Sequence, residues 1–106
     1  MKIYIKSSTD FPEYSNDIKS LGVLLFESPD VVIGKRSSSD NYVYVYKFTE
    51  YNSPHRGNKT TGWLNSGIWK QYPDGLWYKY NSVSGGKLSD GVKTLEQIAA
   101  AVKKED

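Results

Sequence analysis

The feature that most constrains the fold is a strictly alternating segment in the middle of the chain. Over residues 42–49 every even position is aromatic, and the odd positions begin with two valines. The even positions are Tyr42, Tyr44, Tyr46 and Phe48. Successive side chains of a strand point to opposite faces, so the segment predicts a strand with one aromatic face and one valine face. The alternation leaves open which of the two faces is buried.

Length and composition limit the classes of site that the chain can build. A chain of 106 residues fits one domain, 1–106, with a modest core. The absence of cysteine excludes disulfides and thiolate metal sites, and a single histidine, His55, excludes a multi-histidine site within one protomer. We therefore expect no metal and no other cofactor.

The sequence predicts a soluble protein. No apolar stretch approaches the roughly 20 residues that a bilayer span requires. Residues 1–6 alternate and are too short for a signal peptide, so we expect a cytoplasmic protein without membrane contact. Residues 2–6 are predicted to form a strand, and residues 7–12 a loop.

Two alternatives remain for residues 16–26. Ser15 is a suitable helix N-cap, and Ile18, Leu21 and Leu25 follow at helical spacing, which favours one helix over the whole segment. In the alternative, Gly22 caps a shorter helix, and residues 23–26 form a buried strand.

The next segments indicate antiparallel strands. Strands are expected over 31–36 and 42–51, and the polar residues 52–61 are expected to form an exposed loop. The sequence Tyr72-Pro73-Asp74-Gly75 suits a type I turn followed by a glycine bulge, which fixes the register of a second hairpin. In that register Lys70 pairs with Tyr78, and Ile68 with Tyr80. Residues 81–91 are expected to form a loop.

The C-terminal segment predicts a helix with a capping box formed by Thr94 and Gln97. Its apolar stripe comprises Leu95, Ile98, Ala99 and Val102. We expect this stripe to pack on Val43 and Val45. The predicted fold is therefore α+β: a twisted antiparallel sheet of four to six strands, with the C-terminal helix on one face and a short N-terminal helix.

Aromatic and basic residues coincide in the sequence. Residues 35–93 contain nine basic and four acidic residues, whereas the segments on either side carry net negative charge. Aromatic rings beside cations are typical of protein interfaces and of surfaces that bind unpaired bases. We assign this role to the following residues: Tyr42, Tyr44, Tyr46, His55, Arg56, Lys59, Trp63, Trp69, Lys70, Trp77 and Lys79.

The chain resembles small orphan proteins of bacteriophages and mobile elements, among them anti-CRISPR proteins. The resemblance lies in the opening residues 2–10, the Tyr- and Trp-rich sheet and the closing helix from Thr94. It implies a non-enzymatic inhibitor or adaptor that binds a larger bacterial protein or nucleoprotein complex stoichiometrically. It assigns no residue a role.

Three other functions are compatible with the sequence. Stacked aromatics with Lys47, Lys70 and Lys79 would suit a single-stranded nucleic-acid binder. His55, with Arg56 beside it, would suit a small RNase in which the histidine is the general base. An exposed aromatic face would also suit a homodimer interface.

Overall fold

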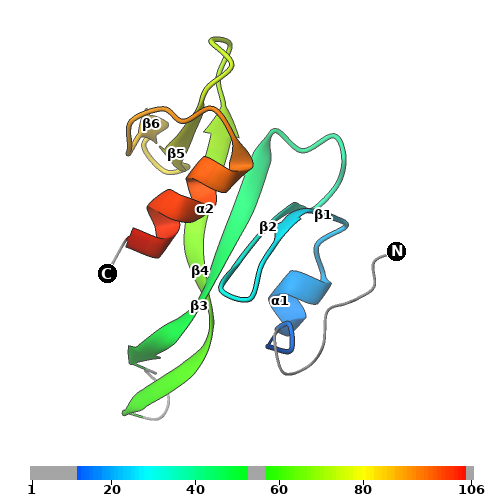
Figure 1. Cartoon of the computed structure of the whole chain (residues 1–106). Coiled ribbons are helices and arrows are strands. Elements are labelled where there is room, and N and C mark those ends of the chain that lie inside the picture. The colour runs from blue at the N-terminus through cyan, green and yellow to red at the C-terminus, as the bar shows by residue number, and fades with distance from the viewer. Residues whose placement is uncertain (1–11, 53–56, 105–106) are drawn as a thin grey trace.

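The computed structural model of the chain describes residues 12–52 and 57–104, and its centre is one antiparallel sheet of six strands. Each strand pairs with the next one along the chain (Figure 1). The strands are β1 (Val23–Glu27), β2 (Val31–Lys35), β3 (Tyr42–Asn52), β4 (Lys59–Gln71), β5 (Trp77–Asn81) and β6 (Gly86–Lys87). The helices are α1 (Asn16–Lys19) and α2 (Leu95–Lys104). This architecture confirms the α+β prediction; the strand predicted over residues 2–6 lies outside the described residues.

The larger core lies between the sheet and α2. Val43 and Val45 of β3 are fully buried there, so the valine face of that strand packs against the helix. The other buried members are Val31, Ile33, Trp69, Ile98, Ala99 and Val102. Fully burying one such aliphatic side chain stabilises the fold by about 1.5–3 kcal/mol. The predicted contact between the two valines and the helix is confirmed.

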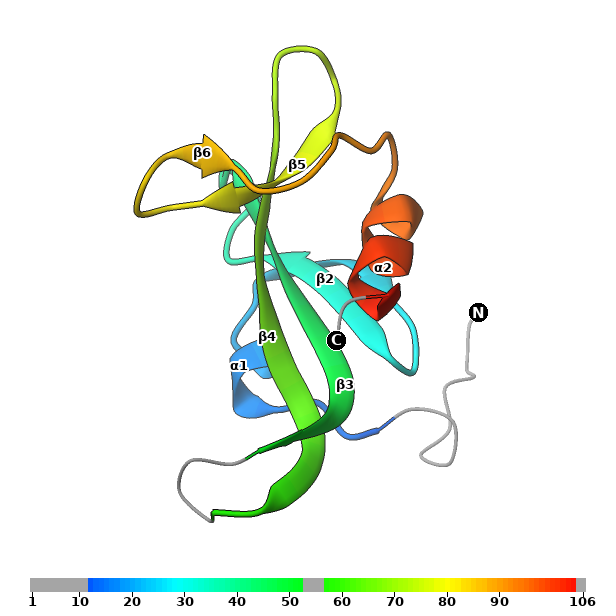
Figure 2. The same cartoon turned by 90° about the vertical axis from the view of Figure 1, so that its left-hand side faces the viewer.

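A smaller core lies on the opposite face of the sheet, under α1 (Figure 2). Its buried residues are Ile18, Val32 and Tyr46. Ser15 caps the helix as predicted, since its hydroxyl accepts a hydrogen bond from the Ile18 N–H at 3.4 Å. Both faces of β3 are therefore buried in the first half of the strand.

The segment after α1 is a strand, so the single long helix over 16–26 is wrong. The helix ends with Ser20 as its C-cap, and not at Gly22. A Cβ at Gly22 would lie 2.5 Å from the carbonyl oxygen of Arg36, so glycine is needed there for close backbone approach. The alternative strand over 23–26 is confirmed as β1. Its expected burial is wrong, because β1 is at the sheet edge and leaves Leu24 and Leu25 exposed.

Strands β3 and β4 form a long twisted ribbon that extends past both helices (Figure 2). The predicted loop over 52–61 is too long, because Thr60 and Thr61 are already paired with β3. The β-branched threonines suit a strand. Between the Tyr44–Ile68 and Tyr46–Asn65 pairs, β4 contains a bulge, where Gly67 has φ 100°.

The β4–β5 hairpin has the predicted register. Lys70 pairs with Tyr78, and Ile68 with Tyr80. The turn is closed by a hydrogen bond of 2.8 Å from the Gly75 N–H to the Tyr72 carbonyl, and Gly75 has φ 86°. The prediction of a loop throughout 81–91 is wrong at β6, which pairs with the end of β5.

The capping box before α2 is confirmed. The Gln97 N–H donates to the Thr94 hydroxyl at 3.1 Å, and the Thr94 N–H donates to the Gln97 side-chain oxygen at 3.2 Å. These bonds satisfy backbone donors that the first turn of a helix leaves unpaired. They fix where α2 begins after the chain leaves the sheet.

Candidate functional site

Two residues predicted to present exposed rings are buried. Trp69 is 1% exposed and belongs to the core under α2, and Tyr46 is 6% exposed and packs with Ile18 and Val32. Trp69 is opposite Val43 in the β3–β4 pairing, which places its indole on the helix-covered face. Trp77 is half-buried and packs against the same core. The prediction that these rings form a free surface is wrong for Trp69 and Tyr46.

Trp63 of β4, which pairs with Phe48 of β3, makes structural contacts with the segment before α1. Its indole N–H donates to the carbonyl of Glu13 at 2.9 Å, and its ring packs edge-on against Tyr14 and Phe48. These contacts hold the segment before α1 against the sheet. Lys59 is exposed at the start of β4, and His55 and Arg56 lie outside the described residues.

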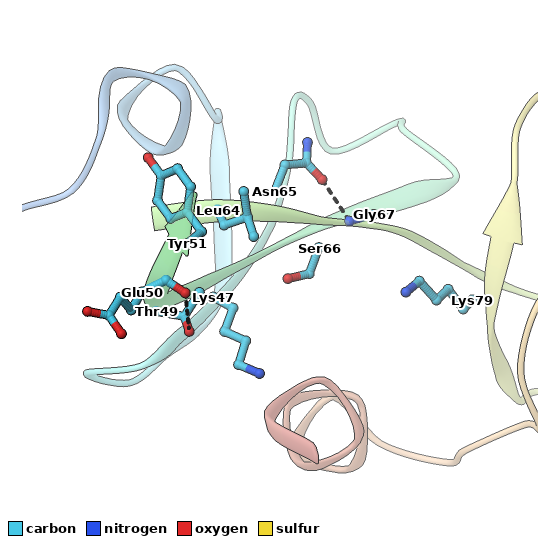
Figure 3. A pocket seen from close by; sticks show the side chains of 9 residues that line it. All are labelled: Lys47, Thr49, Glu50, Tyr51, Leu64, Asn65, Ser66, Gly67 and Lys79. Carbon is cyan, nitrogen blue, oxygen red and sulfur yellow. Dashed lines mark hydrogen bonds between the residues drawn. The ribbon is translucent and has the colours of Figure 1, made fainter. Parts of the chain in front are cut away.

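A shallow groove of about 660 Å³ lies on the α2 side of the β3–β4 ribbon. The Lys47 and Lys79 side chains project into it from β3 and β5 (Figure 3). Its other lining includes Thr49, Tyr51, Leu64 and Ser66. Lys79, a predicted site residue, therefore lies on the opposite face of the sheet from Lys70, because its strand partner is Trp69.

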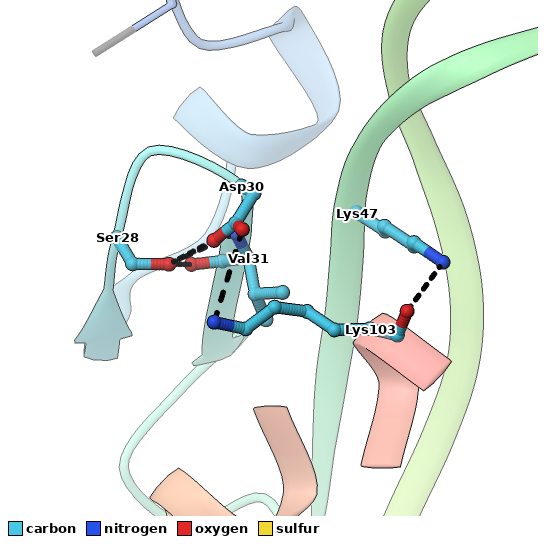
Figure 4. A network of polar contacts seen from close by, with 5 residues as sticks. All are labelled: Ser28, Asp30, Val31, Lys47 and Lys103. Carbon is cyan, nitrogen blue, oxygen red and sulfur yellow. Dashed lines mark hydrogen bonds and ion pairs between the residues drawn. The ribbon is translucent and has the colours of Figure 1, made fainter. Parts of the chain in front are cut away.

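Lys47 also anchors the end of α2. Its ammonium donates to the Lys103 carbonyl at 3.4 Å, where the helix macrodipole favours a cation (Figure 4). Lys103 in turn forms an ion pair with Asp30 at 3.8 Å, and Asp30 accepts from the Ser28 hydroxyl at 2.9 Å. This part of the groove is thus tied to the packing of the helix.

A second surface lies on the sheet face opposite α2, around the β4–β5 hairpin. We call it the tyrosine–lysine face, and its members are Tyr42, Tyr72, Tyr78, Tyr80, Lys70 and Lys87. Register places them together: Lys70 pairs with both Tyr42 and Tyr78, and Lys87 pairs with Tyr80. All four tyrosines are half-buried, and Lys87 is exposed.

The two ammonium groups lie over the tyrosine rings. Lys70 Nζ is 5.7, 5.5 and 5.1 Å from the ring centroids of Tyr42, Tyr72 and Tyr80. Lys87 Nζ is 4.6 Å from that of Tyr72 and 4.1 Å from that of Tyr78. Contacts of this length are attractive cation–π interactions.

The rings also contact one another. Tyr42 and Tyr80 are stacked with centroids 5.4 Å apart, and Tyr72 and Tyr78 meet edge-on at 5.0 Å. Arg36 extends the same pattern, because its guanidinium lies 4.8 Å from the ring centroid of Tyr44. On the tyrosine–lysine face, each tyrosine ring therefore contacts both another ring and a lysine ammonium.

The sequence pattern indicates Tyr42 and Lys70 as members of a binding surface, but it does not indicate the other four members of the tyrosine–lysine face. Tyr78 could have been found, because the predicted register already placed it opposite Lys70. Tyr72 and Tyr80 follow from the same alternation. Lys87 had no such signal, since the two-residue strand β6 depends on tertiary pairing with β5.

Hydrogen bonding fixes the protonation of the hairpin end of this face. Asp74 accepts from the Leu76 N–H at 2.9 Å and from the Tyr78 hydroxyl at 2.8 Å. These bonds lower the pKa of Asp74, and the bond to Asp74 raises the pKa of Tyr78. The neighbouring Tyr80 raises the pKa of Tyr42. The phenols of Tyr42 and Tyr78, whose pKa values are both raised, are therefore neutral at neutral pH and can donate hydrogen bonds.

Replacing Asp74 with asparagine is expected to lower the pKa of the Tyr78 phenol, because the charged acceptor is lost. At pH values below the ordinary tyrosine pKa of 10.0, the hydrogen bond from Tyr78 to Asp74 is fully formed in the wild type. The bond is lost as the pH rises through the raised pKa that Tyr78 has in the folded state. NMR titration of ring-labelled tyrosine measures the shift. Asp90→Asn is the matched control: Asp90 acts on Tyr78 through charge, so its effect should be smaller, and an equal effect would contradict the assignment.

Comparison with known proteins found no family model, no curated protein and no solved structure that matches the chain. Within residues 12–52 and 57–104, no helix is both long and apolar enough to cross a membrane. The same residues contain no group of three or more His, Cys, Asp or Glu side chains arranged to hold a metal ion.

Proposed function

We propose that this protein is a non-enzymatic binding protein whose protein partner docks on the tyrosine–lysine face. The observation that carries the proposal is the placement of two ammonium groups over four half-buried tyrosine rings on the face opposite α2. Tyrosine provides a large contact area at low cost in side-chain entropy, and it is enriched at interface hot spots. A small domain can present the roughly 800 Å² of a standard interface without a deep pocket.

The proposed partner is a larger bacterial protein or nucleoprotein complex, which the protein would inhibit by stoichiometric, anti-CRISPR-like binding. The resemblance to small proteins of bacteriophages and mobile elements supports this class of partner. Blocking such a complex requires an interface and no chemical step, which agrees with a site built from packed rings and two cations.

The test is affinity capture from a bacterial lysate with and without nuclease treatment. One protein complex should be recovered after nuclease treatment, and its affinity should be measured with purified components. Loss of all bound material on nuclease treatment would instead indicate that the partner is nucleic acid.

The double variant Lys70→Gln, Lys87→Gln is expected to weaken binding of the captured complex by at least tenfold, a change of about 1.4 kcal/mol. Glutamine removes the positive charge and keeps a polar but shorter side chain, so the measurement reports the loss of the ammonium group together with its ring contacts. Lys93→Gln, Lys104→Gln removes two exposed cations elsewhere and should leave affinity unchanged. Equal affinities of both variants would contradict the proposed site.

A further inference from the structure

We infer that the partner meets the tyrosine–lysine face with an extended acidic segment, in which two carboxylates on alternate residues pair with Lys70 and Lys87. This inference rests on the proposed function and names the chemistry of the partner at the same face.

Both ammonium groups contact one ring, which limits their separation. Lys70 Nζ is 5.5 Å and Lys87 Nζ 4.6 Å from the Tyr72 centroid, so the two nitrogens are no farther apart than the sum of these distances. Residues i and i+2 of an extended chain point to the same side and are about 6.6–6.8 Å apart. Two carboxylates at that spacing can reach both cations at once.

The cations stay on the rings when a carboxylate binds. An anion that approaches from solvent adds charge attraction and leaves the cation–π contacts in place. A nucleic-acid base must displace a cation before it can stack. Lys70 contacts three rings, and each contact contributes about 0.5–1 kcal/mol. Displacing Lys70 would therefore offset the roughly 1–3 kcal/mol gained by stacking one base.

Acidic side chains near the face disfavour a long polyanion. Asp40 acts electrostatically on Tyr42, and Asp74 and Asp90 act on Tyr78. A phosphate backbone that crosses the whole face would meet these carboxylates as well as the two lysines. A peptide with only two carboxylates can pair with the lysines, and its uncharged residues can contact the tyrosines.

The experiment is a display selection with a random dodecapeptide library on the folded wild-type protein, counter-selected on the Lys70→Gln, Lys87→Gln variant. Enriched peptides should carry Asp or Glu at positions i and i+2. A synthetic peptide from the selection should bind the wild type and the Lys93→Gln, Lys104→Gln control equally. Its affinity for the counter-selection variant should be at least tenfold lower, with a similar loss when its acids become Gln or Asn.

A labelled oligothymidine strand is titrated in parallel. Strong binding that falls steeply with salt and is lost in Lys70→Gln, Lys87→Gln would overturn the acidic segment in favour of nucleic acid. Enriched peptides without paired acids would also overturn it. Neither result decides whether the captured complex depends on Lys70 and Lys87, so the proposed site is judged separately.

Discussion

Replacing Trp69 with alanine is expected to lower the free energy of unfolding by about 3–5 kcal/mol. The indole is 1% exposed and lies in the core under α2, so the substitution leaves a cavity in addition to the lost apolar transfer energy. The free energy of unfolding of a small domain is only about 5–15 kcal/mol, so the variant should be partly unfolded or close to unfolding. Urea denaturation followed by circular dichroism measures the difference.

Two further variants separate packing from other effects at Trp69. Leu64→Ala removes an apolar side chain that is 40% exposed, and its cost should be far smaller. Trp69→Phe retains a ring and removes an indole N–H that is buried without a hydrogen-bond partner among the described residues, so it should cost less than half of Trp69→Ala. A Trp69→Ala protein as stable as Leu64→Ala would contradict the burial of the indole.

The second large effect is expected for Ile98→Asp in α2. Ile98 is fully buried against the sheet, and an unpaired carboxylate there should lower the free energy of unfolding by about 3–5 kcal/mol at neutral pH. Burial disfavours the charged form and raises the pKa of the introduced carboxyl in the folded state. The deficit relative to wild type should therefore shrink as pH falls through that raised value.

Ala100→Asp is the matched control, because Ala100 is exposed on the same helix. It introduces the same charge without burial, so its effect should be small and nearly independent of pH. Parallel urea titrations at neutral and mildly acidic pH provide the comparison. If the deficit of Ile98→Asp grew on acidification, α2 would not cover the valine face as described.

Local sequence patterns predicted the elements that depend on neighbouring residues. The turn at Tyr72–Gly75 set the hairpin register, and Thr94 with Gln97 set the start of α2. The predicted binding surface was less successful, because an aromatic residue is equally suited to a core and to an interface. Trp69 and Tyr46 belong to the first class, and Tyr42 to the half-buried surface.

The sequence by itself determined the antiparallel hairpins, the capped C-terminal helix and the alternation of β3, because turns, caps and strand periodicity act over a few residues. Only the tertiary structure decided which rings are buried and which meet the lysines. Placing two helices on opposite faces covers Trp69 and Tyr46, and pairing β5 with the two residues of β6 brings Lys87 to Tyr78. These outcomes depend on contacts between distant segments, which no local pattern encodes.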